Sequence, residues 1–413
     1  MAPYWKGFGL VASSLFLVSP LLAQEEEAEY QEDPSQEVSD ASHVFFMSRA
    51  EAIPAKEGMK DNPDHYLEGY IQALVDMHFY EHQVVVFVEG DIVYLYNLPN
   101  NALLSNSIIS FVEDVPCVCE VRVKCELTEE ECDRRKDYVM QPCISGVWFP
   151  QSTVLFQPLV ASPRQVVYSV AYRAGDEVVG KKCIAISMGD NFPVYRWNNV
   201  LPWCGDLQIG IEAGIWAPFN FDDVPHTDGT CCELFNTDYL LGFPLCYAVD
   251  RWTYRLRLYH ISSHLGDEFM VNHPEYLDLR VNPSFEAIDL FASYQFTKSL
   301  RAYVGPGVII HSDRSFPMDN FYVEYGAEWR FLPTRFHYHR LYGTPFIAID
   351  VQNWQVRDWE FDFTIKAGYE FSKLAGIGRK MRFFASYHHG FSYEGQFFLE
   401  KTDYGEFGFS WGF

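Results

Sequence analysis

The chain contains 413 residues with a formal net charge of −25 at pH 7, and 17% of its residues are aromatic. So acidic a chain repels phosphate backbones, which argues against nucleic acid as a partner. The length allows two or three domains, and abundant aromatic residues at average hydrophobicity favour strands that are apolar on one face only.

The N-terminal residues carry the pattern of an exported protein. Lys6 precedes an apolar run over residues 10–22, and Ala23 offers a small-residue cleavage site, so residues 1–23 are expected to be a signal peptide. The run is too short for a membrane helix. Glu and Asp without any basic residue dominate the next stretch, which predicts an acidic disordered linker over residues 24–60.

Ten cysteines in an exported chain point to an oxidising compartment. Cys117 and Cys119 lack the spacing of common zinc sites, so disulfides are expected rather than a metal. Adjacent Cys231 and Cys232 rarely bond each other, so one of them is expected to bond another chain. A cysteine-rich exported chain of this kind resembles chlamydial envelope proteins, and that resemblance implies disulfide links to other envelope proteins.

Residues 61–126 predict a small α+β domain. Asn62-Pro63-Asp64 is a helix start signal, and a second helix is expected over residues 101–112. The β-branched segments 84–88 and 92–96 flank Glu89-Gly90-Asp91 as a hairpin, and 118–123 forms a last strand. Residues 127–160 are charged in part and are expected to be a linker.

This order of elements resembles the BON domain. The resemblance lies in Val86-x-Val88-Glu89-Gly90-Asp91-Ile92-Val93-Tyr94-Leu95 and Val112-x-x-Val115-Pro116-x-Val118-x-x-Val121, with Cys117 where that family has glycine. It implies a periplasmic location and contact with phospholipid or with partner proteins. A small α+β spacer without a ligand is the alternative.

From residue 161 to residue 413 the sequence alternates between apolar and polar residues in segments of about 10 residues. Residues 361–371 are an example, with Phe361, Phe363 and Ile365 against Asp362 and Thr364. About 12 such segments, an even number, predict a transmembrane antiparallel β-barrel. The segments start near Val166, Ile184, Gln208, Tyr239, Trp252, Ser284, Arg301, Tyr322, Pro345, Glu360, Met381 and Tyr404.

The last segment places Phe407, Phe409, Trp411 and Phe413 on one face. An aromatic alternation ending in a terminal Phe is the pattern that the outer-membrane assembly machinery recognises, so that machinery is an expected partner through Phe413. The fold class is therefore mainly β, and the expected location is the outer membrane, in contact with its lipid, with the α+β domain in the periplasm. With both barrel ends periplasmic, segments 221–238, 266–282 and 393–403 are extracellular loops, and 332–343 is long for a periplasmic turn.

The segment that starts at Trp252 carries candidate catalytic residues. Arg255 and Arg257 must face the lumen, because a charge facing lipid near mid-membrane costs about 2–4 kcal/mol. Alternation then places His260 and Ser262 together on the lipid side near the outer end of the strand.

This His-x-Ser pair resembles the His-x-Ser-Asn of outer-membrane phospholipase A and of the outer-membrane lipid A deacylases, although Ser263 replaces the Asn. The resemblance implies a lipid-acyl hydrolase in which Ser262 is the nucleophile and His260 its base. Glu286 is preferred over Asn282 and Ser284 as the residue that orients His260. Asp267 and Glu268 would bind a calcium ion, the one cofactor considered.

Other interpretations of the same residues remain open. His260 and Ser262 can simply meet water and phosphate at the headgroup level, or Ser263 and His264 can be the pair that matters, facing inward. The non-enzymatic alternative is a structural or transport barrel, linked by disulfides in the envelope. The further histidines lack a carboxylate at ligand spacing and are expected to be interfacial or loop residues: His337, His339, His388 and His389.

Three stretches of the barrel region resemble the DUF1207 family, a domain of unknown function. They are Gly189-Asp190-Asn191-Phe192-Pro193, Tyr259-His260-x-Ser262-Ser263-His264-Leu265-Gly266-Asp267-Glu268-Phe269 and Gly395-Gln396-Phe397. The resemblance implies an envelope barrel over residues 150–413 and no particular activity.

Overall fold

The computed structural model describes residues 63–124, 128, 146–222, 232–276, 281–336 and 341–413. The predicted signal peptide, the acidic linker and most of the segment 127–145 lie outside these residues. Within the described part of the chain, none of the helices has the length and apolar composition that a membrane crossing requires.

The first described region has the predicted order α-β-β-α-β. Its elements are α1 (Pro63–His78), β1 (Val85–Glu89), β2 (Ile92–Tyr96), α2 (Ala102–Glu113) and β3 (Glu120–Val123). Strand β2 lies between an antiparallel β1 and a parallel β3. Ile71, Val86 and Ile108 are fully buried where the helices pack on the sheet, and the Asn101 side chain caps α2 by accepting from the Leu103 and Leu104 amides.

A buried histidine makes this region sensitive to acid. Burial lowers the pKa of His82 to about 3, while an unfolded histidine has a pKa of about 6.5. The unfolded chain therefore takes up the proton at a higher pH than the folded chain does. The free energy of unfolding has its full value above about pH 6.5 and declines as the pH falls below that point. Between pH 7 and pH 5 we expect a loss on the order of 2 kcal/mol.

Hydrogen exchange of peptides spanning residues 79–97, corrected for the intrinsic effect of pH, measures this loss. His82→Phe cannot titrate, so its protection is expected to be the same at both pH values. A variant that responds to pH as strongly as the wild type would show that another group is responsible.

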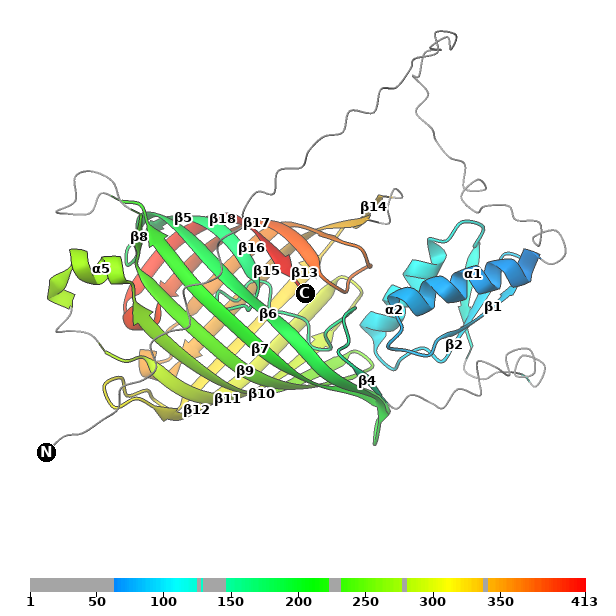
Figure 1. Ribbon diagram of the computed structural model, residues 1–413, viewed down its shortest axis with the longest axis horizontal. Coiled ribbons are helices and arrows are strands. Elements are labelled where there is room, and N and C mark those ends of the chain that lie inside the picture. The colour runs from blue at the N-terminus through cyan, green and yellow to red at the C-terminus, as the bar shows by residue number, and fades with distance from the viewer. Residues whose placement is uncertain (1–62, 125–127, 129–145, 223–231, 277–280, 337–340) are drawn as a thin grey trace, which may run out of the picture. The chain divides into compact units, whose positions relative to one another are not determined.

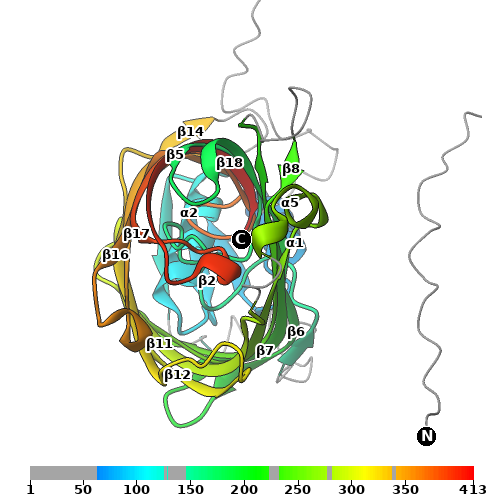
Figure 2. The ribbon, with the colours of Figure 1, turned by 90° about the vertical axis from the view of Figure 1, so that its left-hand side faces the viewer.

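The remaining residues form a closed antiparallel barrel of twelve long strands (Figures 1 and 2), as predicted. Each strand pairs with the next along the chain, and the last pairs with the first to close the ring. The strands are β5 (Tyr168–Asp176), β6 (Gly180–Val200), β7 (Gly205–Asn220), β9 (Asn236–Val249), β10 (Trp252–Leu265), β11 (Ser284–Gln295), β12 (Leu300–Ser312), β13 (Phe321–Arg330), β15 (Leu341–Trp354), β16 (Asp362–Ser372), β17 (Lys380–Phe391) and β18 (Lys401–Gly412).

Short elements lie at the ends of the barrel. Three short strands extend neighbouring long ones, and one helix and three 3-10 turns lie in the connections. They are β4 (Gly146–Trp148), β8 (Glu233–Leu234), α5 (Asp267–Asn272), η2 (Pro274–Tyr276), β14 (Thr334–Phe336), η4 (Gln355–Arg357) and η5 (Gly395–Phe397).

The barrel wall has an apolar outer face and a charged inner face. In β10, Leu256 and Leu258 are 45% and 46% exposed, whereas Arg255 and Tyr259, which flank this stretch, are buried. The same alternation runs around the ring, as period-two patterning predicts. Outward-facing apolar residues include Leu241, Phe243, Leu245, Leu290, Val304, Ile347, Ile349, Ile365, Phe383, Phe407 and Phe409.

The C-terminal residue departs from this alternation. Phe413 is only 4% exposed, unlike Phe407, Phe409 and Trp411, because it follows the last residue of β18 and packs its ring under Arg379. Its recognition by an assembly machinery stays a prediction.

Two chain segments pack inside the lumen. Leu155, Phe156 and Leu159 are buried against inward-facing residues such as Phe291, and Arg301 donates to the carbonyls of Pro158 and Gln157 at 3.0 and 2.8 Å. The second half of the predicted linker is thus a packed part of the barrel, because its apolar residues find partners on the inner wall. Likewise the predicted outer loop 393–403 folds inward, where Arg357 donates to the carbonyls of Ser392 and Phe398.

The cysteines that the structure describes do not form the predicted disulfides with one another. Cys183 and Cys246 are buried thiols on the inner face, and Cys117, Cys204 and Cys232 are exposed thiols. Cys125, Cys132, Cys143 and Cys231 lie outside the described residues.

Candidate functional site

The predicted catalytic pair lies on the outer face of the barrel wall. His260 and Ser262 are both partly exposed, while Ile261 and Ser263 between and beside them are buried. Inward Arg257 fixes this phase, because it forms ion pairs on the inner wall with Asp289 of β11 and Glu212 of β7. The arginine argument from the sequence therefore placed both residues on the correct face.

Glu286 lies directly beside His260 on the next strand. The two residues are partners in the register of β10 and β11, and His260 Nδ1 is 2.8 Å from Glu286 Oε1. An ionised carboxylate can only accept, so the proton of His260 sits on Nδ1 and the lone pair on Nε2. That tautomer is the one a general base requires. Of the three orienting candidates, the structure brings Glu286 to His260, whereas Asn282 bonds Asp313.

Ser262 lies two residues beyond His260 on the same face. Among the hydrogen bonds of the described residues, none joins Ser262 to His260, a contact that often tightens only when substrate binds. Outward Leu258, Leu241 and Ile288 line the wall next to the pair. An apolar chain lying along the wall would therefore meet the pair at its end.

A second imidazole reaches Glu286 from the other side. His311 Nδ1 is 2.6 Å from Glu286 Oε2, and the two residues are register partners in β11 and β12. The pairing shifts between Glu286 and Ala287, which leaves Ile310 as an extra residue on β12. This β-bulge turns both Ile310 and His311 outward, although strict alternation after buried Ile309 would place His311 in the lumen.

Sequence reasoning missed His311 for that reason. The one signal in the sequence is the adjacent apolar pair Ile309-Ile310, where alternation expects a single apolar residue.

The alternative pair Ser263 and His264 is wrong as an inward-facing pair. Ser263 is buried and donates to Asn236 Oδ1 at 3.1 Å. His264 is exposed on the opposite face of the strand, where its ring packs against Tyr239. Neighbouring residues of a strand point to opposite sides, so the two cannot act together.

Asp267 and Glu268 begin α5, and both are exposed. No third His, Cys, Asp or Glu of the described residues joins them at ligand distance. Calcium takes six to eight oxygen ligands, which include backbone carbonyls and water as well as carboxylates, so calcium binding at this pair stays a prediction.

The remaining histidines differ from the sequence expectation in one case. His388, expected to be interfacial or in a loop, is fully buried on the inner face, where its Nε2 donates to the Phe391 carbonyl. Its neighbour His389 is exposed on the outer face and forms a hydrogen-bonded pair with Asp403 on β18. His337 and His339 lie outside the described residues.

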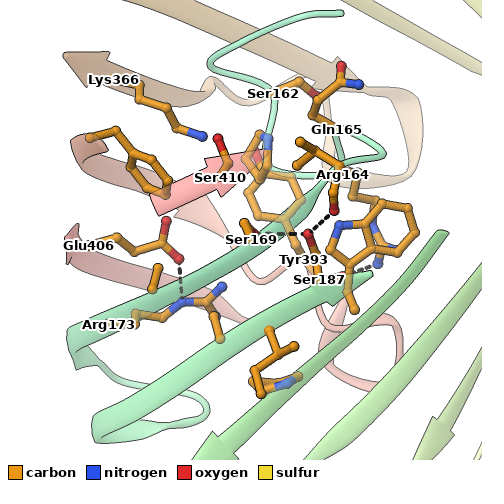
Figure 3. Close-up of a pocket in the computed structure, with 18 of the residues that line it drawn as sticks. Ser162, Arg164, Gln165, Ser169, Arg173, Ser187, Lys366, Tyr393, Glu406 and Ser410 are labelled. Atoms are coloured by element: carbon orange, nitrogen blue, oxygen red, sulfur yellow. Dashed lines mark hydrogen bonds and ion pairs between the residues drawn. The ribbon is translucent and has the colours of Figure 1, made fainter. Parts of the chain in front are cut away.

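The lumen also contains a cavity of about 80 Å³ beside the segment 158–167, lined by both apolar and charged residues. Figure 3 shows Arg173 bound to Glu406 and Ser169 bound to Ser187 in its wall, with Lys366 pointing into it. Arg173 also bonds Asp176 and Glu394. The charges of the cavity are largely paired, and the described residues place no serine or cysteine beside a histidine there, so the outer-face cluster is the stronger candidate site.

Comparisons with solved structures found other barrels. Outer-membrane phospholipase A from Escherichia coli is 11% identical with a TM-score of 0.40, over 63% of this chain and 98% of that chain. The calcium-bound outer-membrane phospholipase dimer from Salmonella typhi is 11% identical with a TM-score of 0.39, over 62% and 98%. The KdgM porin is 9% identical with a TM-score of 0.29, over 59% and 99%.

At such low identities these likenesses concern the fold alone. A search of curated protein sequences found no match. The model of one protein family, described as "Protein of unknown function (DUF1207)", matches residues 78–413. This match covers most of the chain and includes all three stretches in which the sequence resembles that family, so the chain belongs to the DUF1207 family.

Proposed function

We propose that this protein is an outer-membrane hydrolase of lipid acyl esters that uses Ser262, His260 and Glu286. The observation that carries the proposal is the 2.8 Å hydrogen bond between His260 Nδ1 and Glu286 Oε1, on the same outward face as Ser262. A base oriented by a carboxylate, with a hydroxyl two residues along the strand, is the arrangement of a serine hydrolase.

The outward apolar residues support the membrane location. A water-exposed wall carrying this many large apolar side chains would be unfavourable, whereas lipid solvates it. Closure of the ring leaves no sheet edge to face hydrocarbon. We place the barrel in the outer membrane and the BON-like region in the periplasm, where it would contact phospholipid or a partner protein.

The position of the site suits a lipid ester. Strand β10 ends a few residues beyond Ser262, at the end of the barrel opposite to the C-terminus, because consecutive strands run antiparallel. With the C-terminus periplasmic, this is the outer leaflet, near the level where acyl chains join their headgroups. The ester carbonyl of a lipid in that leaflet would then reach Ser262 while its chain lies along Leu258.

The reaction begins when Ser262 Oγ attacks the ester carbonyl carbon and its proton passes to His260 Nε2. The bond from the carbonyl carbon to the alcohol oxygen then breaks, and the leaving alcohol takes that proton. Water attacks the resulting acyl-Ser262 ester after losing a proton to the same Nε2. The fatty acid leaves, and Ser262 regains its proton. Glu286 stays ionised and stabilises the imidazolium in both steps.

The test is acyl release from phospholipid and from lipid A by the folded protein, with and without calcium. The wild type is expected to release fatty acid and Ser262→Ala is not. Ser284 is the matched control, because it is the register partner of Ser262 on β11 and faces the same side. Loss of acyl release in Ser284→Ala, with activity retained in Ser262→Ala, would identify Ser284 on the neighbouring strand as the nucleophile.

The transport alternative is less well supported, because packed residues such as Phe156 occupy part of the lumen. Ion conductance in planar bilayers without any acyl release would favour that alternative over the hydrolase.

A further inference from the structure

Glu286 binds two imidazoles at once on the outer face of the barrel. Its Oε1 is 2.8 Å from His260 Nδ1 and its Oε2 is 2.6 Å from His311 Nδ1. We propose that His311 is a positioning residue of the site, which holds Glu286 against His260 and, on gaining a proton, weakens His260 as a base. The inference rests on the proposed function and adds to it a control by pH.

The backbone supports a dedicated role for His311. A bulge at Ile310 is needed to bring His311 to the outer face, and a bulge bends its strand and leaves one residue out of the ladder. Bulges are over-represented beside active sites, where they redirect a side chain. Here the redirected side chain reaches the second oxygen of the carboxylate that orients the base.

The two hydrogen bonds fix the orientation of the carboxylate. Glu286 is 36% exposed and His311 is 70% exposed, so without a second partner the Glu286 side chain would rotate among several rotamers. With both oxygens engaged, Oε1 is held toward His260. At metal sites, loss of a partner that orients a histidine ligand typically costs about 10- to 100-fold in affinity or activity, and we expect a loss of similar size here.

The protonation states of His260 and His311 give the proposed site its dependence on pH. Ionised Glu286 only accepts, so each histidine donates from Nδ1 and keeps its Nε2 free. His311 Nε2 is exposed and can take a proton from water. The positive charge that results offsets the charge of Glu286 and repels a second proton on His260. His260 then accepts the Ser262 proton less readily, and hydrolysis slows.

Few other charges face this cluster in the described part of the chain. Asp313 follows in the loop after β12, where hydrogen bonds from Ser315 hold the pKa of its carboxyl below the usual range. Arg314 stands next to it in the sequence and is exposed. On β10, His264 lies on the same face as His260. Strand β13 contributes no charge beside His311, because its pairing with β12 ends at Val308 and Phe321.

The barrel contains a matched control for the proposed coupling. His389 also lies on the outer face and pairs with a carboxylate, Asp403, on the next strand. No second histidine bonds Asp403 among the described residues, and the residues two positions from His389 are Tyr387 and Phe391. His389→Gln therefore changes an outward histidine–carboxylate pair without touching the proposed site.

The experiment is a pH–rate profile of acyl release for wild type, His311→Gln, His311→Ala and His389→Gln. At low pH the wild-type rate is expected to fall more steeply than that of His311→Gln, because only the wild type gains a positive charge on the far side of Glu286. His311→Gln keeps a donor to Glu286, so it is expected to match the wild-type rate at high pH. His311→Ala is expected to be about 10- to 100-fold slower at all pH values. His389→Gln is expected to match the wild type.

A second measurement separates this inference from the proposed function. Histidine-ring NMR of the folded protein in detergent follows the hydrogen-bonded Nδ1 proton of His260 without any turnover. The signal of this proton is expected in the wild type and in His311→Gln, and is expected to be lost in His311→Ala, where Glu286 is no longer held toward His260. An unchanged signal in His311→Ala would overturn the inference even if lipid is hydrolysed. A signal that depends on His311 without any acyl release would retain the positioning role and reject the hydrolase.

Discussion

Alanine at Ser262, alanine at His260 and alanine at both are expected to lower the rate of acyl release to the same level, about 10³-fold or more below the wild type. In the proposed mechanism, the nucleophile has no base without His260, and the base has no nucleophile without Ser262. Residues that act as one unit show losses that do not add. Steady-state rates on phospholipid dispersed in detergent measure the three variants side by side.

Two controls accompany these variants. Ser284→Ala and His389→Ala remove an outward serine and an outward histidine from the same barrel, and both are expected to stay within about twofold of the wild type, because neither side chain takes part in the proposed proton transfers. A double variant that is much slower than either single variant would contradict a shared mechanism, because independent contributions multiply.

Replacing Asp289 with alanine is expected to destabilise the barrel by about 3–5 kcal/mol. Asp289 is fully buried, and its Oδ2 accepts from Arg257 at 2.5 Å and lies 3.5 Å from Arg255. Glu212 completes the group, 2.9 Å from Arg257. Removing Asp289 takes away the ion-pair partner that the described residues give Arg255 and one of the two partners of Arg257. A buried charge that loses its partner costs far more than the pair contributes.

The measurement is the free energy of unfolding from reversible urea titration of the barrel in lipid vesicles. Asp403→Ala is the matched control, because Asp403 also pairs with a cross-strand base but is 53% exposed. An exposed pair contributes about 0–1 kcal/mol. Similar losses in Asp289→Ala and Asp403→Ala would mean that water reaches the inner wall and screens its charges.

The barrel could be predicted from the sequence because two rules constrain every strand. Side chains alternate strictly along an extended backbone, and charges cannot face hydrocarbon. Arg255 and Arg257 therefore showed which residues of β10 face outward, His260 among them. Spacing on the next strand then placed Glu286 on the same face, close enough to contact His260. These deductions needed only residue spacing on two neighbouring strands.

The rest of the site could not be predicted because it depends on an exception to alternation. The bulge at Ile310 depends on how β11 and β12 pair, which residue spacing alone does not reveal. The packing of residues 155–159 inside the lumen could not be predicted for a similar reason. Leu155 and Phe156 form an apolar run too short to show a period, and their burial follows from partners on strands far away in the sequence, such as Phe291.

The position of the proposed site has a consequence for kinetics. Ser262 lies on the outer wall, while residues such as Phe156 occupy part of the lumen, so lipids would arrive at the proposed site by lateral diffusion in the plane of the bilayer. Encounter is then a two-dimensional process. Its frequency follows the mole fraction of substrate among the surrounding lipids, and adding inert amphiphile slows it even when the total amount of substrate in the vessel stays the same.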